Sequence, residues 1–379
     1  MQEQRWAPYC VQFQDLNFER RLVEYSRPDG SFCSKWVPVG MPRIDPQWVK
    51  TVFYLFRRNP ESGEIDKDPS GTGFFVLRSS TELAGYSHWY AVSNWHVTHD
   101  LGASIIRINA LHGNHRFIEF DPIEWLFERD GDDLSIIDVT ENLQGSLAEA
   151  WVVDERNFIS KERYDDLMID IGEDTIMVGL FSAHHGGERN IPSARFGNIS
   201  MMPSDKALVK QPNHVQRPSY LVDTRSRGGY SGSPVFVYRT PDADIRRGIR
   251  PLPLTQQNVL FALLGVHCGQ FWEPVKVRKA PKRAEAVGVP ILEGDDLRIE
   301  GGMTIVIPAW EISSLLDREE LEMKRKDRDK KRRGSWERLP VPEAEGEAVS
   351  PPANDVNPKH REDFKSLLHA AVQKRESED

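Results

Sequence analysis

Gly228-Gly229-Tyr230-Ser231-Gly232-Ser233-Pro234-Val235 is the stretch of this sequence that decides the fold. It places a serine between glycines, directly before a β-forming run at 235–238. A serine hydroxyl is a poor nucleophile unless it is exposed, aligned and next to a base. Glycines on both sides allow the tight backbone that exposes it, and they let backbone N–H groups point to where an oxyanion would form. The stretch therefore predicts a nucleophilic Ser231 rather than a flexible Gly/Ser loop.

A base for this serine lies far upstream, in Ala91-Val92-Ser93-Asn94-Trp95-His96-Val97. An apolar strand pattern runs into His96, which predicts an imidazole held at a strand end. A single histidine is more often a satisfied core residue, but the serine motif favours a functional role. His99, next to Asp100, is interpreted as a solvated loop residue.

An acid stands between these two stretches, in Asp132-Asp133-Leu134-Ser135-Ile136-Ile137. Such an acid would hold the imidazole in one tautomer and stabilise it when charged. We prefer Asp133, because an apolar strand begins directly after it. Asp132 is the next candidate, and Asp130 and Asp138 also compete for the role.

The chain order His96, Asp133, Ser231, in these local contexts, resembles the trypsin-like (chymotrypsin-fold) serine peptidases of bacterial type. The resemblance implies Ser231 as nucleophile, His96 as general base and Asp133 as orienting acid. It also implies an oxyanion hole made by the backbone N–H groups of Gly229 and Ser231. Tyr230 stands where the family frequently has Asp or Asn, and we interpret it as a tolerated departure.

The rest of the sequence fits an all-β fold, because short apolar runs alternate with turn signals and helical periods are few. The resemblance implies two six-stranded antiparallel β-barrels, the trypsin-like double barrel, with a C-terminal helix and a charged tail. The peptidase domain would span 46–315, with the first barrel at about 46–160 and the second at about 170–312. The expected strands are 49–56, 71–77, 89–93, 105–108, 116–120, 175–180, 194–200, 220–223, 235–238, 263–269 and 303–308, and a helix is expected over 309–321.

The flanks differ from this core in composition. Residues 1–45 form an N-terminal extension, and 316–358 are a charged and Pro-rich linker. Residues 359–379 are expected to form a short amphipathic helix, which would dock a regulatory protein partner or an intramolecular groove. A frayed surface helix explains the pattern equally well. The apolar positions fall at helical spacing, at Phe364, Leu367, Leu368 and Ala371.

The substrate pocket of this fold is lined by the segment before the serine and by the strand after it. Arg225 stands where trypsin carries an acid, which disfavours cleavage after Lys or Arg. Gly265 to Gly269 resembles the Gly-Ile-His-x-Gly of bacterial glutamyl endopeptidases, in which a histidine and a hydroxyl hold the substrate carboxylate. His267 and Ser226 match those positions, with Gly269 beside them, so we expect a preference for Glu or Asp. The alternative is that His267 is a strand residue bonded to backbone.

Bulk composition limits the other classes of function. The formal net charge is −9, so nucleic-acid binding is not expected. Three cysteines argue against a disulfide framework and for a reducing compartment, and the start of the chain does not look like a signal peptide. The sequence has no run of about 18 apolar residues, so we expect no membrane contact and a cytoplasmic location. We expect no metal and no cofactor, because neither a ligand set nor a nucleotide fingerprint is present.

These patterns favour a serine endopeptidase that acts on protein or peptide substrates through an acyl-enzyme and is regulated by a partner or trigger. A catalytically silent scaffold of the same fold, which docks partners through its tail, is the first alternative. An esterase is the second. Its G-x-S-x-G elbow expects a helix after the serine and the histidine last in the chain, and neither holds here.

Overall fold

The computed structural model describes residues 21–26, 32–37, 46–143, 148–224, 229–239, 260–276 and 296–336. The chain divides into two compact units, residues 1–330 and 331–379. Within the N-terminal extension, β1 (Arg21–Ser26) and β2 (Phe32–Val37) form an antiparallel hairpin. The predicted C-terminal helix at 359–379 lies outside the described residues.

The first lobe is a seven-stranded sheet in the order β7-β6-β3-β4-β5-β8, with β9 pairing in parallel to β4. The strand pairs of this sheet do not close into a barrel. Among the described residues no pairing joins the edge strands β7 and β8, and the segment between them is mostly loop. The strands are β3 (Val52–Phe56), β4 (Gly71–Ser79), β5 (Ser87–Ser93), β6 (Ile105–Asn109), β7 (His115–Ile118), β8 (Ser135–Asp138) and β9 (Val153–Asp154).

The second lobe is a closed six-stranded barrel in the order β10-β11-β14-β17-β16-β15, which confirms the predicted second barrel. A separate two-stranded hairpin, β12–β13, lies between β11 and β14 in the chain. Its strands and those of the barrel are β10 (Asp174–Gly179), β11 (Ser193–Met201), β12 (Val209–Lys210), β13 (Gln216–Arg217), β14 (Tyr220–Asp223), β15 (Pro234–Arg239), β16 (Leu260–Lys276) and β17 (Asp296–Pro308).

One hydrophobic cluster extends through both lobes. Every residue of β3 is buried, because its two faces pack against different clusters. Tyr54 belongs to the cluster that also contains Phe236 of the second lobe, whereas Phe53 belongs to a cluster within the first. Alternate side chains of one strand thus hold the first sheet together and join it to the barrel.

A buried polar contact also joins the lobes. Arg107 of β6 donates from Nε to Asn190 Oδ1 at 2.7 Å, and Asn190 Nδ2 donates to the carbonyl of Arg107 at 2.6 Å. Arg107 Nη1 reaches the carbonyl of Gly187 at 2.6 Å. The loop that carries Asn190 thereby fastens the barrel to the sheet with groups that satisfy one another.

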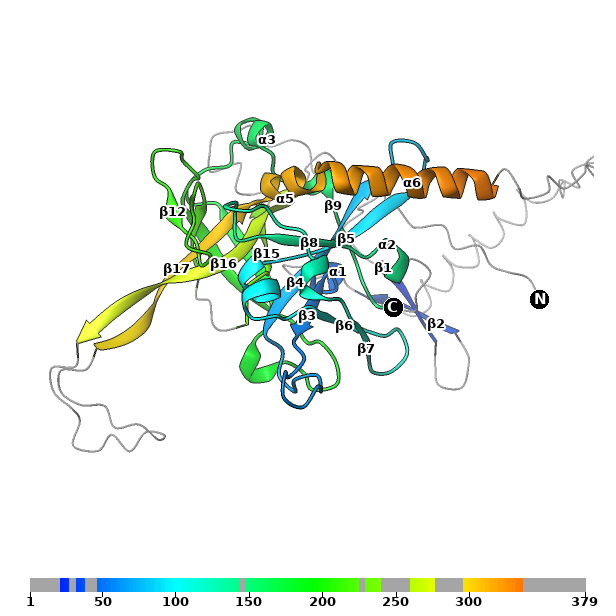
Figure 1. The fold of residues 1–379 in the computed structure, drawn as a ribbon, viewed down its shortest axis with the longest axis horizontal. Coiled ribbons are helices and arrows are strands. Elements are labelled where there is room, and N and C mark those ends of the chain that lie inside the picture. The colour runs from blue at the N-terminus through cyan, green and yellow to red at the C-terminus, as the bar shows by residue number, and fades with distance from the viewer. Residues whose placement is uncertain are drawn as a thin grey trace, which may run out of the picture. The chain divides into compact units, whose positions relative to one another are not determined.

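The chain after β17 continues as two helices, α5 (Ala309–Leu316) and α6 (Glu319–Trp336), shown in orange in Figure 1. Helix α6 begins inside the stretch that the sequence assigns to a linker from residue 316. Its sequence is low in apolar residues but rich in the strong helix formers Glu, Lys and Arg, and it carries acidic residues in its first turn. The other helices are short: α1 (Pro46–Val49), α2 (Thr140–Leu143), α3 (Lys161–Asp166), the π-helix η1 (His96–Asp100) and the 3₁₀ turns η2 (Pro122–Glu124), η3 (Glu155–Asn157) and η4 (Ser182–His184). Among these and the other described residues, no helix is long and apolar enough to cross a membrane.

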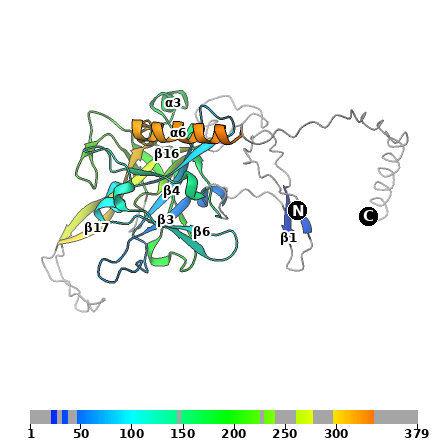
Figure 2. The same cartoon turned by 45° about the vertical axis from the view of Figure 1, so that its right-hand side comes forward.

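Buried charged groups hold α6 against β4, β5 and β8, and the ends of β4 and β5 meet α6 in both views (Figures 1 and 2). Asp329 accepts a hydrogen bond from Ser80 Oγ at 2.7 Å, and its Oδ1 lies 3.1 Å from His88 Nε2. Arg325 donates to Tyr90 Oη, and Arg328 pairs with Asp138 at 3.0 Å. Burial lowers the pKa of His88 more than the nearby Asp329 raises it. The carboxylate of Asp329 is thus held by neutral donors.

Asp329→Ala should lower the free energy of unfolding by about 1–3 kcal/mol, because the variant leaves the hydroxyl of Ser80 without its acceptor. Urea denaturation followed by fluorescence measures the change. Lys330→Ala is the matched control, since Lys330 is the exposed neighbour on the same helix. Equal stabilities of the two variants would contradict this role for Asp329.

Candidate functional site

Two hydrogen bonds join His96 to Asp133 at the end of the first sheet. The Nδ1 atom of His96 lies 2.5 Å from Asp133 Oδ2, and the backbone N–H of His96 donates to Oδ1 at 2.9 Å. The side chain of Asp133 is fully buried, whereas that of His96 is 18% exposed. Because a carboxylate only accepts, the Nδ1–H of His96 donates, and Nε2 is the ring nitrogen left to act as a base.

Sheet register explains why these two residues meet. Strands β5 and β8 are antiparallel neighbours, with Ser93 opposite Ser135. The residues just after β5 and just before β8 therefore lie at the same end of the sheet. Asn94 closes this end, because its Nδ2 donates to the carbonyl of Asp133 at 2.8 Å.

The other aspartates that competed for this role lie elsewhere. Asp138 pairs with Arg328 of α6. Asp130 has a φ of 58°, and its carbonyl accepts from Arg217. Asp132 binds an amide of the second lobe instead of the imidazole. Asp133 is the one of the four whose carboxylate contacts His96.

The loop that carries Ser231 is held between the two lobes. On one side, Thr72 of β4 donates from its N–H to the carbonyl of Ser231 at 2.9 Å and from Oγ1 to the carbonyl of Gly229 at 2.7 Å. On the other side, the N–H of Gly232 donates to the carbonyl of His267 at 2.9 Å. The loop is therefore fixed by its backbone, and within the described residues the recorded hydrogen bond of Ser231 is made by its carbonyl.

One first-lobe glycine lies beside both His96 and Ser231. A Cβ atom on Gly71 would lie 2.6 Å from Val97, the residue after His96, and 3.5 Å from the carbonyl oxygen of Ser231. The imidazole-bearing turn and the serine loop thus approach the same point of β4. The turn that carries His96 and the loop that carries Ser231, which belong to different lobes, therefore both border Gly71.

Two glycines give the serine loop its shape. Gly229 has a φ of +99° and Gly232 a φ of +85°, a region that favours glycine. A side chain on Gly232 would also clash with the first lobe, because its Cβ would lie 2.0 Å from the carbonyl oxygen of Thr72. These conformations account for the glycines of the motif. Gly229 and Ser231, the predicted oxyanion-hole residues, lie in this strained turn.

Tyr230 anchors the same loop in the barrel, a role that sequence reasoning missed. Its side chain is fully buried, and its hydroxyl bonds to Ser193 Oγ and to Arg195 Nε, the latter at 3.1 Å. Arg195 also lies over the Tyr230 ring, 5.5 Å from its centroid. Tyr230, interpreted from the sequence as a tolerated departure, therefore anchors the serine loop. No local sequence pattern indicates this role, because its partners belong to β11.

The predicted pocket residues are described only in part. Arg225 and Ser226 lie outside the described residues. His267 is buried in β16, and Gly269 is half-buried beside Pro212. Burial lowers the pKa of His267 from 6.5 to about 3, helped by the positive charge of nearby His96 and opposed by a hydrogen bond with the backbone of Ile305. His267 is thus a neutral imidazole close to His96.

Other reactive groups near the site are unsuited to catalysis. Burial raises the pKa of the Cys268 thiol well above its usual range, and the charges of Asp133 and Asp132 add to this. Its Sγ contacts the carbonyl of Ile305 at 3.6 Å. A buried thiol of raised pKa is inert, which agrees with a packing role. The described residues hold no group of three or more side chains suited to bind a metal.

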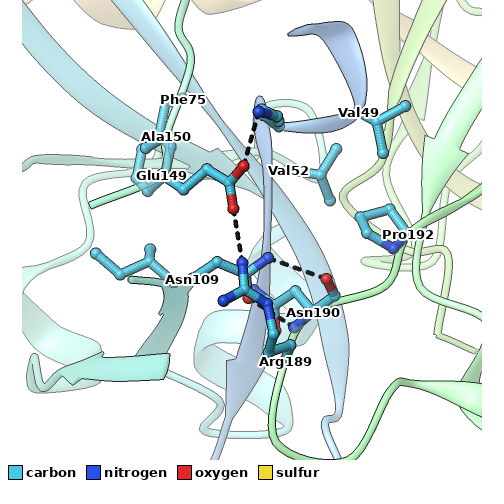
Figure 3. A pocket seen from close by; sticks show the side chains of 11 residues that line it. Val49, Val52, Phe75, Asn109, Glu149, Ala150, Arg189, Asn190 and Pro192 are labelled. Carbon is cyan, nitrogen blue, oxygen red and sulfur yellow. Dashed lines mark hydrogen bonds and ion pairs between the residues drawn. The ribbon is translucent and has the colours of Figure 1, made fainter. Parts of the chain in front are cut away.

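A cavity of about 200 Å³ lies elsewhere, where the first lobe meets the loop after β10. Glu149 forms ion pairs with Lys50 and with Arg189, each at 2.7 Å. Figure 3 shows the pair of Glu149 with Arg189. The single carboxylate of this cavity is thus shared by two cations. None of the predicted catalytic residues lines it.

Comparisons with known proteins leave the family of this chain open. No protein-family model matches it, and no protein with a curated description matches it. Among solved structures it is similar to the Rv3671c protease of M. tuberculosis. The inactive form shares 16% identity over 73% of this chain and 92% of that chain, with a TM-score of 0.36. The active form shares 17% identity over 73% and 84%, with a TM-score of 0.37. Similarity at this level assigns neither family nor activity.

His267 should remain neutral throughout the range in which the folded protein is stable. Burial disfavours its charged form, so it should not titrate between about pH 4 and pH 9. Histidine-labelled NMR follows its ring signals across this range, with His267→Gln to assign them. A midpoint for His267 near 6.5 would contradict its buried position.

Proposed function

We propose that this protein is a serine endopeptidase that cleaves peptide bonds through Ser231, His96 and Asp133. The observation that carries the proposal is the paired contact of His96 with Asp133, at 2.5 Å and 2.9 Å, beside the loop of Ser231. A buried carboxylate that binds both the ring and the backbone of one histidine leaves Nε2 as a base. That arrangement is what activation of a serine hydroxyl requires.

The mechanism follows from these contacts. Ser231 Oγ attacks the peptide carbonyl while His96 Nε2 takes its proton, and Asp133 stabilises the imidazolium through Nδ1–H. The oxyanion of the tetrahedral intermediate is held by the N–H groups of Gly229 and Ser231. His96 then gives its proton to the leaving amine, which departs and leaves an acyl-enzyme. Water attacks the ester, again with His96 as base, and Ser231 recovers its proton.

Two other functions, a catalytically silent scaffold and an esterase, compete with the proposed peptidase function. A catalytically silent scaffold of the same fold would keep the backbone contacts that hold the Ser231 loop without using the Ser231 hydroxyl. An esterase of the nucleophile-elbow type is disfavoured, because the strand β15 follows Ser231 where that fold places a helix.

The substrate preference we propose is for Glu or Asp before the cleaved bond. Support comes from His267, a neutral imidazole whose pKa responds to the charge of His96 and which therefore lies close to the predicted base. A neutral ring N–H can donate to a carboxylate without the cost of burying a further cation. Gly269 of the same strand would leave room beside it.

A fluorophosphonate probe should label wild-type protein at Ser231 and should not label Ser231→Ala. Asp133→Asn should reduce the labelling rate by about 10⁴-fold, because the imidazole loses its tautomer. Ser314→Ala is the control, since Ser314 is an exposed serine of α5 outside the motif. Mass spectrometry of the labelled peptide identifies the site. Absence of labelling in wild type under all conditions would favour the scaffold.

Peptide libraries should show cleavage after Glu at least about 10-fold faster than after Gln, because a hydrogen bond to a charged group contributes about 1.5–3 kcal/mol. His267→Val should lower kcat/KM for the Glu peptide much more than for a Leu peptide. Dominant cleavage after Leu, Ala or Arg would exclude the acidic preference while leaving the peptidase mechanism intact.

A further inference from the structure

The β12–β13 hairpin of the second lobe is built around a rigid turn. Gln211 directly follows β12, and its backbone is bonded twice within the turn. Its N–H donates to the carbonyl of Val215 at 2.9 Å, and its own carbonyl accepts from His214 N–H at 2.9 Å. The Gln211 side chain is only 2% exposed, so its position is set by the hairpin and by what it touches.

This hairpin forms hydrogen bonds with each residue of the segment 130–133, which carries Asp133. The four contacts reach across the two lobes and involve backbone groups and one side chain of the segment 130–133. They are Arg217 Nη2 to Asp130 O at 3.0 Å, Asn213 Nδ2 to Gly131 O at 3.0 Å, Gln211 Nε2 to Asp132 Oδ1 at 2.7 Å, and Asp133 N to Gln211 Oε1 at 2.7 Å.

The amide of Gln211 is central to this set, because it binds two consecutive residues of the loop. Its oxygen accepts from the N–H of Asp133, and its nitrogen donates to Asp132 and to Ser219 Oγ, the latter at 3.1 Å. This bonding determines which way the amide points. Two bonds of opposite polarity to adjacent residues leave the loop little freedom to rotate.

The same hairpin also touches the strand that bears the predicted pocket. A Cβ on Gly269 would lie 3.0 Å from Pro212, the residue after Gln211. The hairpin thus abuts both the segment 130–133 and β16.

We propose that the hairpin 209–217 acts as a clamp, which holds the orienting acid Asp133 in position against His96. Gln211 is the positioning residue of this clamp. This inference rests on the proposed peptidase function. Gln211 itself touches no reacting group. It acts by holding the backbone of Asp133 so that the carboxylate meets both the ring and the N–H of His96.

Charge around Asp132 makes the clamp testable by pH. Burial raises the pKa of Asp132 to about 6, while the hydrogen bond from Gln211 opposes the rise. The N–H donor of Gln211 therefore stabilises the ionised form of Asp132, which dominates above about pH 6. The charged groups that face Asp132 come from three elements. They are Glu311 of α5, Arg217 of β13, and Asp133 of the loop that also carries Asp132. Glu128 of the same loop lines a cavity of about 90 Å³ together with Asp132.

Gln211→Glu keeps the acceptor for Asp133 N–H and replaces the donor to Asp132 with a second carboxyl group. Two carboxyl groups in hydrogen-bond contact share one proton, and they repel once both ionise. The rate of Ser231 labelling relative to wild type should therefore fall as pH rises, from a loss of roughly 10-fold near pH 6 to roughly 100-fold near pH 9. The loss should lie in kcat rather than in KM for peptide hydrolysis.

Two further variants separate positioning from general damage. Gln211→Met has a similar shape and removes both bonds without adding a charge, so its loss of rate relative to wild type should not grow toward pH 9 as that of Gln211→Glu does. Gln216→Glu is the matched control, because Gln216 is an exposed glutamine of β13 in the same hairpin. It makes the same charge change and should label as wild type does. Equal pH profiles for Gln211→Glu and Gln216→Glu, or a loss confined to KM, would overturn the clamp.

An NMR measurement separates this inference from the proposed function. The proton on His96 Nδ1, bonded to Asp133, gives a far-downfield signal that does not depend on activity. Its loss or upfield shift in Gln211→Glu, with Gln216→Glu unchanged, supports the clamp even if wild type fails to label. An unchanged signal in Gln211→Glu overturns the clamp, whatever the labelling shows.

Discussion

Thr72 donates one hydrogen bond to the carbonyl of Ser231 and another to the carbonyl of Gly229, and in this way a strand of the first lobe holds the serine loop of the second. The contact needs close approach of two backbones, which Gly232 permits because a Cβ on it would lie 2.0 Å from the carbonyl oxygen of Thr72. His96 lies on the same side of β4, next to Val97. The candidate site therefore exists only where the lobes are docked, and its geometry depends on how they are held.

Several independent features hold that docking. A hydrophobic cluster extends from Tyr54 of the first sheet to Phe236 of the barrel. Buried polar groups at Arg107 and Asn190 satisfy one another across the lobes. Helix α6 crosses back from the end of the barrel to the first sheet, where Asp329 is buried against Ser80. The first two contacts join the lobes directly, and the third joins the first sheet to the helix that follows the barrel.

Much of the fold could be predicted from sequence, for a physical reason. Strands such as β3 and β15 are short runs of apolar residues, rich in β-branched and aromatic side chains, and such runs favour a buried strand. The prediction was wrong where pairing depends on partners: the first lobe is a seven-stranded sheet, β16 continues to Lys276, and a helix replaces the start of the expected linker. Edge pairing and helix docking depend on residues distant in the chain, and no local pattern reports them.

The types of group at the candidate site were evident in the residues themselves, because a glycine-flanked serine, a strand-end histidine and an acid before a strand each have a local pattern. Which aspartate meets the imidazole was settled by the tertiary structure. A tight turn, closed by Leu134 N–H to the carbonyl of Asp132, separates the two neighbours, so that Asp133 contacts His96 while Asp132 contacts Gln211. Only folding brings Gln211 to that turn, and a hydrogen bond between residues so distant in sequence leaves no trace in either local stretch.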